Sequence, residues 1–232
     1  MKPVRTTKCV SPPDVPPLRP GDRLSQPEFH RRYQAYPEDV KFELIGGVVF
    51  MASPTRNPHG EYLSELNLVF TLYKAATRGV RVADNSTVVL GEESEPQPDL
   101  LLRVDEAYGG QVELNAAEYL VGAPELVAEV AHSSLPVDLR PKRRDYQRAG
   151  VLEYVVFSVE EEKVYWFHFP SKRQLKPDRQ GVWRSRVFPG LWLHGPALAA
   201  RDSATLIATV QQGLASPEHA AFVRDLEGRR KK

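Results

Sequence analysis

Leu126-Val127-Ala128-Glu129-Val130-Ala131 is an apolar run with a single carboxylate near its centre. Its length and composition are typical of a strand buried in the core of a sheet. An ionised carboxylate buried there without a partner would cost several kcal/mol. Glu129 therefore reaches solvent through strand alternation, pairs with a nearby arginine, or takes part in a functional site.

Helices and strands are expected to alternate on both sides of this run. Ser25-Gln26-Pro27-Glu28 has the capping-box pattern, which predicts a helix that ends before Pro37. Gly46-Gly47 joins two β-prone runs within residues 41–51, which predicts a hairpin. The pattern also predicts helices at residues 59–77 and 141–149, a final helix at 204–212, and strands at 80–82, 87–90, 99–104, 153–159, 163–169 and within 182–193. This mixture predicts an α/β (α+β) fold with a central mixed β-sheet flanked by helices.

Length and composition indicate one folded domain. The chain has 232 residues, 41% of them hydrophobic, which is enough for a real core but too little for a second full domain. Residues 1–20 are rich in proline, so we expect a disordered leader there. The folded domain is expected over residues 21–200, and residues 201–232 are expected to form a helical extension with a solvated basic tail.

Charge and cysteine content exclude several classes of protein. The formal net charge is +1, so any surface for nucleic acid must be local. Cys9 is the single cysteine, which excludes an internal disulfide and a cysteine-cluster zinc site. The sequence has neither an apolar run long enough to span a membrane nor the apolar stretch of a signal peptide, so we expect a cytoplasmic protein.

Three carboxylates recur in apolar β-prone segments, namely Glu43, Asp99 and Glu129. If they converge, their mutual repulsion raises their pKa values unless a cation neutralises them. Mg²⁺ prefers such hard oxygen ligands, and a bound Mg²⁺ supports hydrolysis of phosphodiesters. Lys142 lies early in the helix after Glu129, from where its side chain could reach the end of the strand. The alternative for Lys142 is an exposed helix lysine among neighbouring arginines.

Four segments together resemble the Uma-two family of restriction-endonuclease-like proteins, which belongs to the PD-(D/E)XK nuclease superfamily. They are Phe42 to Gly47, Pro98 to Leu101, Pro124 to Val130, and Lys142 to Tyr154. In the last segment Lys142, Tyr146, Ala149-Gly150-Val151 and Glu153-Tyr154 follow the family pattern in order. The resemblance extends over about residues 25–193.

The resemblance implies a restriction-endonuclease-like core in the domain of residues 21–200. It implies that Asp99 and Glu129 bind the metal, that Glu43 assists from the first hairpin, and that Lys142 is the catalytic lysine. The implied activity is that of an endonuclease that hydrolyses DNA with Mg²⁺, or with Mn²⁺ in its place. An enzyme that cuts both strands is expected to act as a homodimer.

Two departures from the family pattern leave alternatives open. Gly46 replaces an acidic residue, and the loop His132-Ser133-Ser134-Leu135-Pro136 replaces a Ser-Pro-Ser/Thr stretch. The main alternative is therefore a catalytically degenerate member of the fold that acts as a DNA-binding or oligomerisation module. A further alternative is a structural protein whose strand carboxylates face solvent.

Several other residues are each open to two interpretations. His59 starts a helix and lies near the metal in one interpretation, or is structural in the other. Ser133 and Ser134 lack the strand-turn-helix context of a serine hydrolase, and the chain has no phosphate-loop or dinucleotide motif. A basic stretch could contact phosphate or be a solvated helix face, and it consists of Arg140, Lys142, Arg143, Arg144 and Arg148. Three tryptophans could stack on bases or fill the core, namely Trp166, Trp183 and Trp192.

Overall fold

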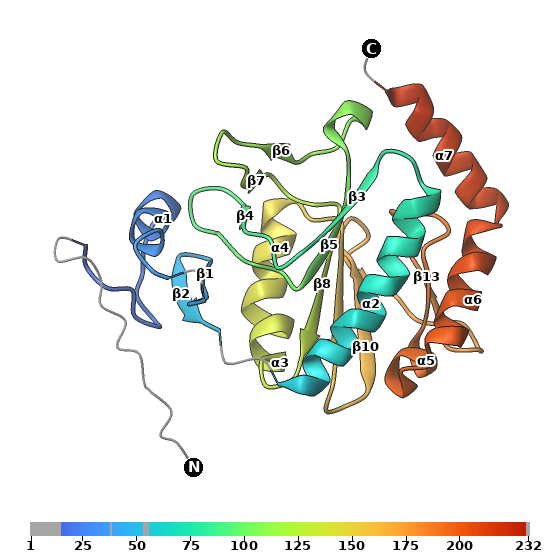
Figure 1. The fold of residues 1–232 in the computed structure, drawn as a ribbon, viewed down its shortest axis with the longest axis horizontal. Coiled ribbons are helices and arrows are strands. Elements are labelled where there is room, and N and C mark those ends of the chain that lie inside the picture. Colours follow the sequence, from blue (N-terminus) through green and yellow to red (C-terminus); the bar gives the residue numbers. More distant parts are fainter. Residues whose placement is uncertain (1–14, 38, 53–55, 231–232) are drawn as a thin grey trace.

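A mixed six-stranded sheet forms the centre of the molecule (Figure 1). The computed structural model describes residues 15–37, 39–52 and 56–230, so most of the predicted leader lies outside it. The strand order is β11-β10-β9-β8-β5-β3. The strands are β3 (Val80–Asp84), β5 (Leu100–Val104), β8 (Leu126–Ala131), β9 (Glu153–Ser158), β10 (Lys163–His168) and β11 (Arg173–Gln174). The pair β8 and β9 is parallel and the others are antiparallel, which confirms the predicted mixed sheet.

Helices cover both faces of this sheet (Figure 1). One face packs against α2 (Asn57–Ala76), α5 (Gly195–Ala200) and α6 (Ser203–Leu214), followed by α7 (Pro217–Arg229). The other face packs against the helical segment made of α3 (Leu135–Val137), the π-helical turn η2 (Asp138–Lys142) and α4 (Arg143–Ala149).

Strand alternation sorts the core between these two layers. Leu100, Leu102 and Ala128 belong to the cluster on the α2 side. Leu101 and Val127 belong to the cluster on the α4 side. Side chains alternate between the two faces along a strand. Glu129 in β8 and Asp99 just before β5 are each two positions from one of these residues, so they also face the α4 side.

Smaller sheets surround the central one. The N-terminal part combines α1 (Gln26–Tyr33) with the hairpin β1 (Phe42–Ile45) and β2 (Val48–Met51), around a separate core that includes Phe29 and Leu44. The remaining elements are β4 (Val88–Val89), η1 (Glu106–Tyr108), β6 (Glu113–Leu114), β7 (Leu120–Val121), β12 (Val182–Arg184) and β13 (Trp192–His194).

The hairpin turn was predicted correctly. Gly46 and Gly47 have φ angles of +55° and +76°. A two-residue turn with positive φ at both positions matches the twist of the flanking strands and favours glycine. The turn fixes the register that places Glu43 opposite Phe50.

Several predicted boundaries were wrong. The helix expected to begin at Pro141 begins at Leu135, because a wider π-helical turn tolerates that proline inside the helical segment. Residues 182–193 form parts of two strands, β12 and β13, where one was expected. The helix at 204–212 is not the last, since α7 follows it and takes up part of the predicted basic tail.

The helix at Ser25 is confirmed, but the Ser25 side chain makes no capping hydrogen bond. Lys231 and Lys232 lie outside the described residues. Within the described ranges, none of the helices has the length and hydropathy required to cross a membrane.

Candidate active site

Asp99 and Glu129 face each other where β5 and β8 meet. Leu100 pairs with Ala128, so one further step along the antiparallel register sets Asp99 opposite Glu129. The N–H of Val130 donates to Oδ2 of Asp99 at 2.8 Å, and the N–H of Asp99 donates to Oε2 of Glu129 at 3.3 Å. Sheet register therefore brings together two residues that are thirty positions apart.

Lys142 lies at the centre of the carboxylates. Its Nζ is 3.0 Å from Oε1 of Glu129 and 3.0 Å from Oε2 of Glu43. The residue is only 6% exposed, which excludes the interpretation as an exposed helix lysine. Glu129 is 3% exposed and pairs with this lysine, so it neither faces solvent nor pairs with an arginine.

Glu43 reaches the cluster from strand β1. Its Oε1 accepts the N–H of Gln97 at 2.8 Å, and its Oε2 lies beside Lys142. The backbone contact ties the first hairpin to the segment that leads into Asp99. All four residues predicted for the site, Glu43, Asp99, Glu129 and Lys142, therefore lie in one cluster.

Two members of the cluster, Asp138 and Tyr146, were not predicted as site residues, although Tyr146 belongs to the family pattern. Asp138 is 2% exposed, with Oδ1 at 3.8 Å from Nζ of Lys142 and Oδ2 accepting the Ser134 hydroxyl at 2.6 Å. The Tyr146 hydroxyl donates to Oε1 of Glu129 at 2.9 Å. Both lie four positions from Lys142 along one helical segment, a spacing that places side chains on the same face and could have revealed them.

The cluster holds more negative than positive charge. Burial raises the pKa of Glu129 well above its ordinary value, against the attraction of Lys142. Burial also raises the pKa of Asp138 to about 6, again opposed by Lys142. Burial alone would lower the pKa of Lys142, but the attraction of Glu129, Glu43 and Asp138 outweighs it and raises that pKa well above its ordinary value. Lys142 is therefore a permanent cation at neutral pH.

His59 borders the cluster from the start of α2. Its Nε2 lies 3.1 Å from Oδ2 of Asp99, and its Nδ1 is buried with no partner among the described residues. Burial would lower the pKa of His59, but the hydrogen bond to Asp99 reverses this and raises it. Burial would raise the pKa of Asp99, but the hydrogen bond and charge of His59 lower it. The pKa values of Asp99 and Glu129 are thus shifted in opposite directions.

The donor set fits a hard divalent cation by its chemistry. Carboxylate oxygens are the ligands that Mg²⁺ prefers, and the surplus of negative charge would be relieved by a cation. The N–H of Val130 and Nε2 of His59 both contact Oδ2 of Asp99, and the Asp99 side chain is 17% exposed. Among the described residues, however, no three His, Cys, Asp or Glu side chains already converge as a ligand set. Oε1 of Glu129 is instead engaged by Lys142 and Tyr146.

The other candidates divide between surface and core. Arg140, Arg144 and Arg148 are exposed, whereas Lys142 points inward. Trp166 and Trp183 are buried in the main core with their rings stacked at 6.4 Å, and Trp192 packs beneath the guanidinium of Arg184. The two buried tryptophans thus fill the core and are not available to stack on bases.

An α/β protein of this architecture, with a buried lysine among carboxylates at the meeting of two strands, falls into the class of nuclease-like folds. A solved structure described as "a putative nuclease belonging to DUF820 from Anabaena variabilis ATCC 29413" has the same fold, with a TM-score of 0.54 and 14% sequence identity over 78% of this chain and 97% of that chain. The chain belongs to the Uma2 family, which is the Uma-two family named above. The model of this family is described as "Putative restriction endonuclease" and matches residues 27–200. No curated protein matches the chain.

Proposed function

We propose that the protein is a metal-dependent endonuclease that hydrolyses phosphodiester bonds in DNA. The observation that carries the proposal is the position of Lys142 between Glu129 and Glu43, with Asp99 against Glu129. Membership of the Uma2 family supports the same activity. A structural core does not need three carboxylates around one buried lysine, since the cost of burying charges can exceed the attraction between them.

Asp99 and Glu129 are the proposed metal ligands. Bound there, Mg²⁺ would polarise a phosphoryl oxygen and lower the pKa of the attacking water. Asp99 is suited to this role because it is ionised and partly open to solvent, while His59 and the N–H of Val130 fix its orientation. Glu129 is held by the N–H of Asp99 on one oxygen and by Tyr146 on the other.

Lys142 is the proposed catalytic lysine. A lysine ammonium has three N–H donors. One of them forms a hydrogen bond with Oε1 of Glu129, and a second can meet Oε2 of Glu43, which is an ion-pair partner at 3.0 Å. Asp138 at 3.8 Å lies beyond hydrogen-bond distance. The third donor can hold a water or a phosphate oxygen, which would orient the nucleophile or stabilise charge that develops on the phosphate.

Cleavage of supercoiled plasmid tests this function. Wild type, Asp99→Asn and Lys142→Arg are compared with Mg²⁺, with Mn²⁺ and with EDTA. We expect metal-dependent nicking by wild type and a loss of roughly 10²- to 10⁴-fold in both variants. Asp225→Asn, an exposed carboxylate on α7, serves as the control and should cleave like wild type.

The second candidate is a DNA-binding module that no longer cleaves. It is favoured by the engagement of Oε1 of Glu129 with Lys142 and Tyr146 and by the lack of a ready-made ligand set in the described part of the chain. Wild type that binds DNA but nicks it no faster than Asp99→Asn, under each metal condition, would establish this alternative in place of the nuclease.

A further inference from the structure

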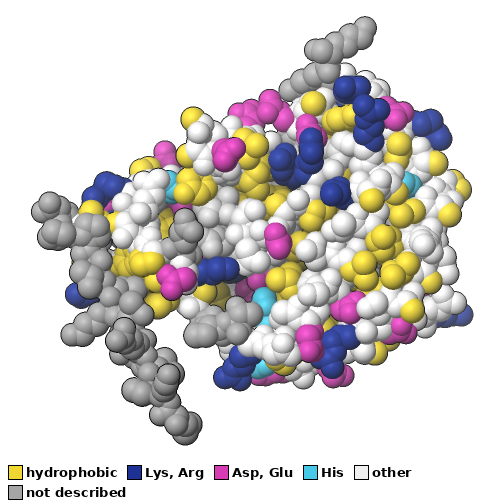
Figure 2. Space-filling model, in the orientation of Figure 1, with side chains coloured by type: hydrophobic (Ala, Val, Ile, Leu, Met, Phe, Trp, Pro, Cys, Tyr) yellow, Lys and Arg dark blue, Asp and Glu magenta, His cyan; other side chains and the backbone are white. Residues whose placement is uncertain are grey.

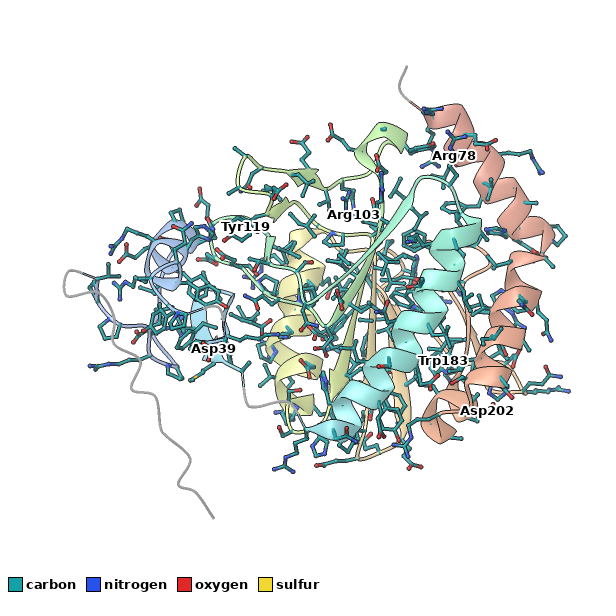
Figure 3. The ribbon with its side chains drawn as sticks, viewed as in Figure 1. Asp39, Arg78, Arg103, Tyr119, Trp183 and Asp202 are labelled. Atoms are coloured by element: carbon teal, nitrogen blue, oxygen red, sulfur yellow. The ribbon has the colours of Figure 1, made fainter. Side chains whose placement is uncertain are left out.

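A groove lined by basic side chains lies at the end of the sheet away from the candidate active site. Its volume is about 470 Å³. Its basic lining residues are Lys74 near the end of α2, Arg78 just after it, Arg81 on β3 and Arg230 after α7. Figure 2 shows Lys and Arg side chains gathered in this upper region, and Figure 3 labels Arg78 within it.

The charge of the groove is only partly neutralised. Nε of Arg81 lies 2.7 Å from Oδ2 of Asp105, so this arginine is paired. Lys74, Arg78 and Arg230 are exposed and form no ion pair with any residue that the structure describes. The ends of α2 and α7 contribute roughly half a negative charge each. About two positive charges remain, and Lys231-Lys232 follow Arg230 in the sequence.

The floor of the groove is a closely packed structure. A side chain at Gly79, which has a φ of +90°, would come within 2.7 Å of the Tyr108 ring. Tyr108 is 8% exposed, and the guanidinium of Arg230 lies 6.0 Å from the centre of its ring. Gly79 therefore lets the turn after α2 pack on Tyr108, which holds Arg78 and Arg230 around one concave surface.

The groove and Asp99 lie at opposite ends of strand β5. Asp99 immediately precedes β5, whereas Val104 at the other end of β5 pairs with Val80 beside the groove. Five residues of extended strand span roughly 17 Å. About five base pairs of a duplex span the same length, since each base pair rises about 3.4 Å.

We propose that this groove binds the phosphate backbone of the DNA duplex on which the candidate active site acts. The inference rests on the proposed function. Exposed guanidinium and ammonium groups without carboxylate partners suit a polyanion, and such contacts supply affinity without reading the base sequence. The groove thereby holds the duplex at a second point, about half a helical turn from the bond to be cut.

A triple variant tests the groove, namely Lys74→Ala/Arg78→Ala/Arg230→Ala. The matched control is Arg173→Ala/Lys176→Ala/Arg179→Ala, which removes three exposed charges from another part of the chain. Both are made in the full chain with Asp99→Ala added, so that DNA is not cut while binding to a fluorescent duplex is measured. At about 0.1 M salt the groove variant should bind at least about tenfold more weakly. Its slope of log Kd against log salt should fall by about 2 to 3, since each phosphate contact contributes about 0.9.

The outcomes separate this inference from the proposed function. Equal binding by groove variant and control overturns the inference, even if plasmid cleavage establishes the nuclease. Weak binding by the groove variant alone supports the inference, even if wild type fails to cleave. Displacement of the duplex by millimolar inorganic phosphate at constant ionic strength overturns it in favour of a site for small anions. Thermal unfolding checks that both variants fold. Each should have the same melting temperature as the Asp99→Ala protein from which it is made.

Discussion

The backbone N–H of Asp99 donates to the carboxylate of Glu129, one step beyond the last registered pair of β5 and β8. The two carboxylates are therefore placed by the sheet itself. Lys142 is then held against Glu129 by the helical segment that connects β8 to β9. Strand register and core packing on both faces of the sheet therefore determine where the cluster forms.

Replacing Lys142 by methionine should strongly destabilise the protein at neutral pH. The variant leaves Glu129 and Glu43 buried without their cation, and breaking a buried pair costs about 3–5 kcal/mol. Urea denaturation at pH 7 measures the loss. Adding Glu129→Gln should restore a large part of it, because the second change removes one of the unpaired charges. Lys176→Met, at an exposed lysine, should stay within about 0.5 kcal/mol of wild type.

Millimolar Mg²⁺ should raise the melting temperature of wild type and leave that of Asp99→Asn unchanged. A ligand bound only by the native state stabilises it by about 2.7 kcal/mol at a concentration of about 100 Kd. Thermal unfolding with Mg²⁺ or EDTA measures this without any need for activity. If Mg²⁺ shifts both proteins equally or neither, Asp99 is not a metal ligand and the carboxylates serve only to hold Lys142.

Much of the fold could be predicted because its elements carry local signals. The hairpin through Gly46-Gly47, the amphipathic α2 and the apolar β8 each show their own periodicity or turn chemistry. The short strands β6 and β7 were missed because two residues carry no periodicity. The start of the helical segment at Leu135 was missed because Pro141 usually begins or breaks a helix, and a π-helical turn accommodates it here.

The sequence does not show which strands pair, or in which register. It therefore could not show that the site residues converge. Glu43, Asp99, Glu129 and Lys142 could be selected as charges that interrupt apolar segments or match the family pattern. Their distances follow from the register of β5 on β8 and from the reach of β1 toward Lys142. Asp138 lies outside the β-prone segments, so only its helical spacing from Lys142 pointed to it.

Tyr146→Phe should weaken the site without disturbing the core. The variant removes the hydrogen bond to Oε1 of Glu129 and keeps the ring that packs 5.0 Å from Tyr154. We expect a loss of about 1–3 kcal/mol in unfolding free energy, since a buried carboxylate loses a donor. Cleavage should fall as well because Glu129 is less firmly oriented.

Tyr154→Phe is the matched control for that prediction. Its hydroxyl donates to the backbone carbonyl of Asp138 at 3.3 Å and does not contact Glu129. The control should lose about 1 kcal/mol of stability and keep its activity at equal fraction folded. A similar loss of cleavage in both variants would mean that losing either buried hydroxyl lowers activity, and that the bond to Glu129 has no special role.

Asp138→Asn should change how stability depends on pH. Burial raises the pKa of Asp138 to about 6 in the folded protein, above its ordinary value of 3.8. Between these two pKa values the folded state binds more protons than the unfolded state. The contribution of Asp138 to the free energy of unfolding therefore falls as pH rises from about 4 to about 6. Above that range its contribution no longer changes with pH. Asparagine does not titrate, and its amide can still meet the Ser134 hydroxyl. Urea denaturation from about pH 4 to about pH 8 measures the free energy of unfolding of both proteins. Relative to wild type, the variant should be more stable at pH 7 than it is at pH 4. A difference that stays constant with pH would mean that Asp138 keeps an ordinary pKa and that Lys142 fully compensates its charge.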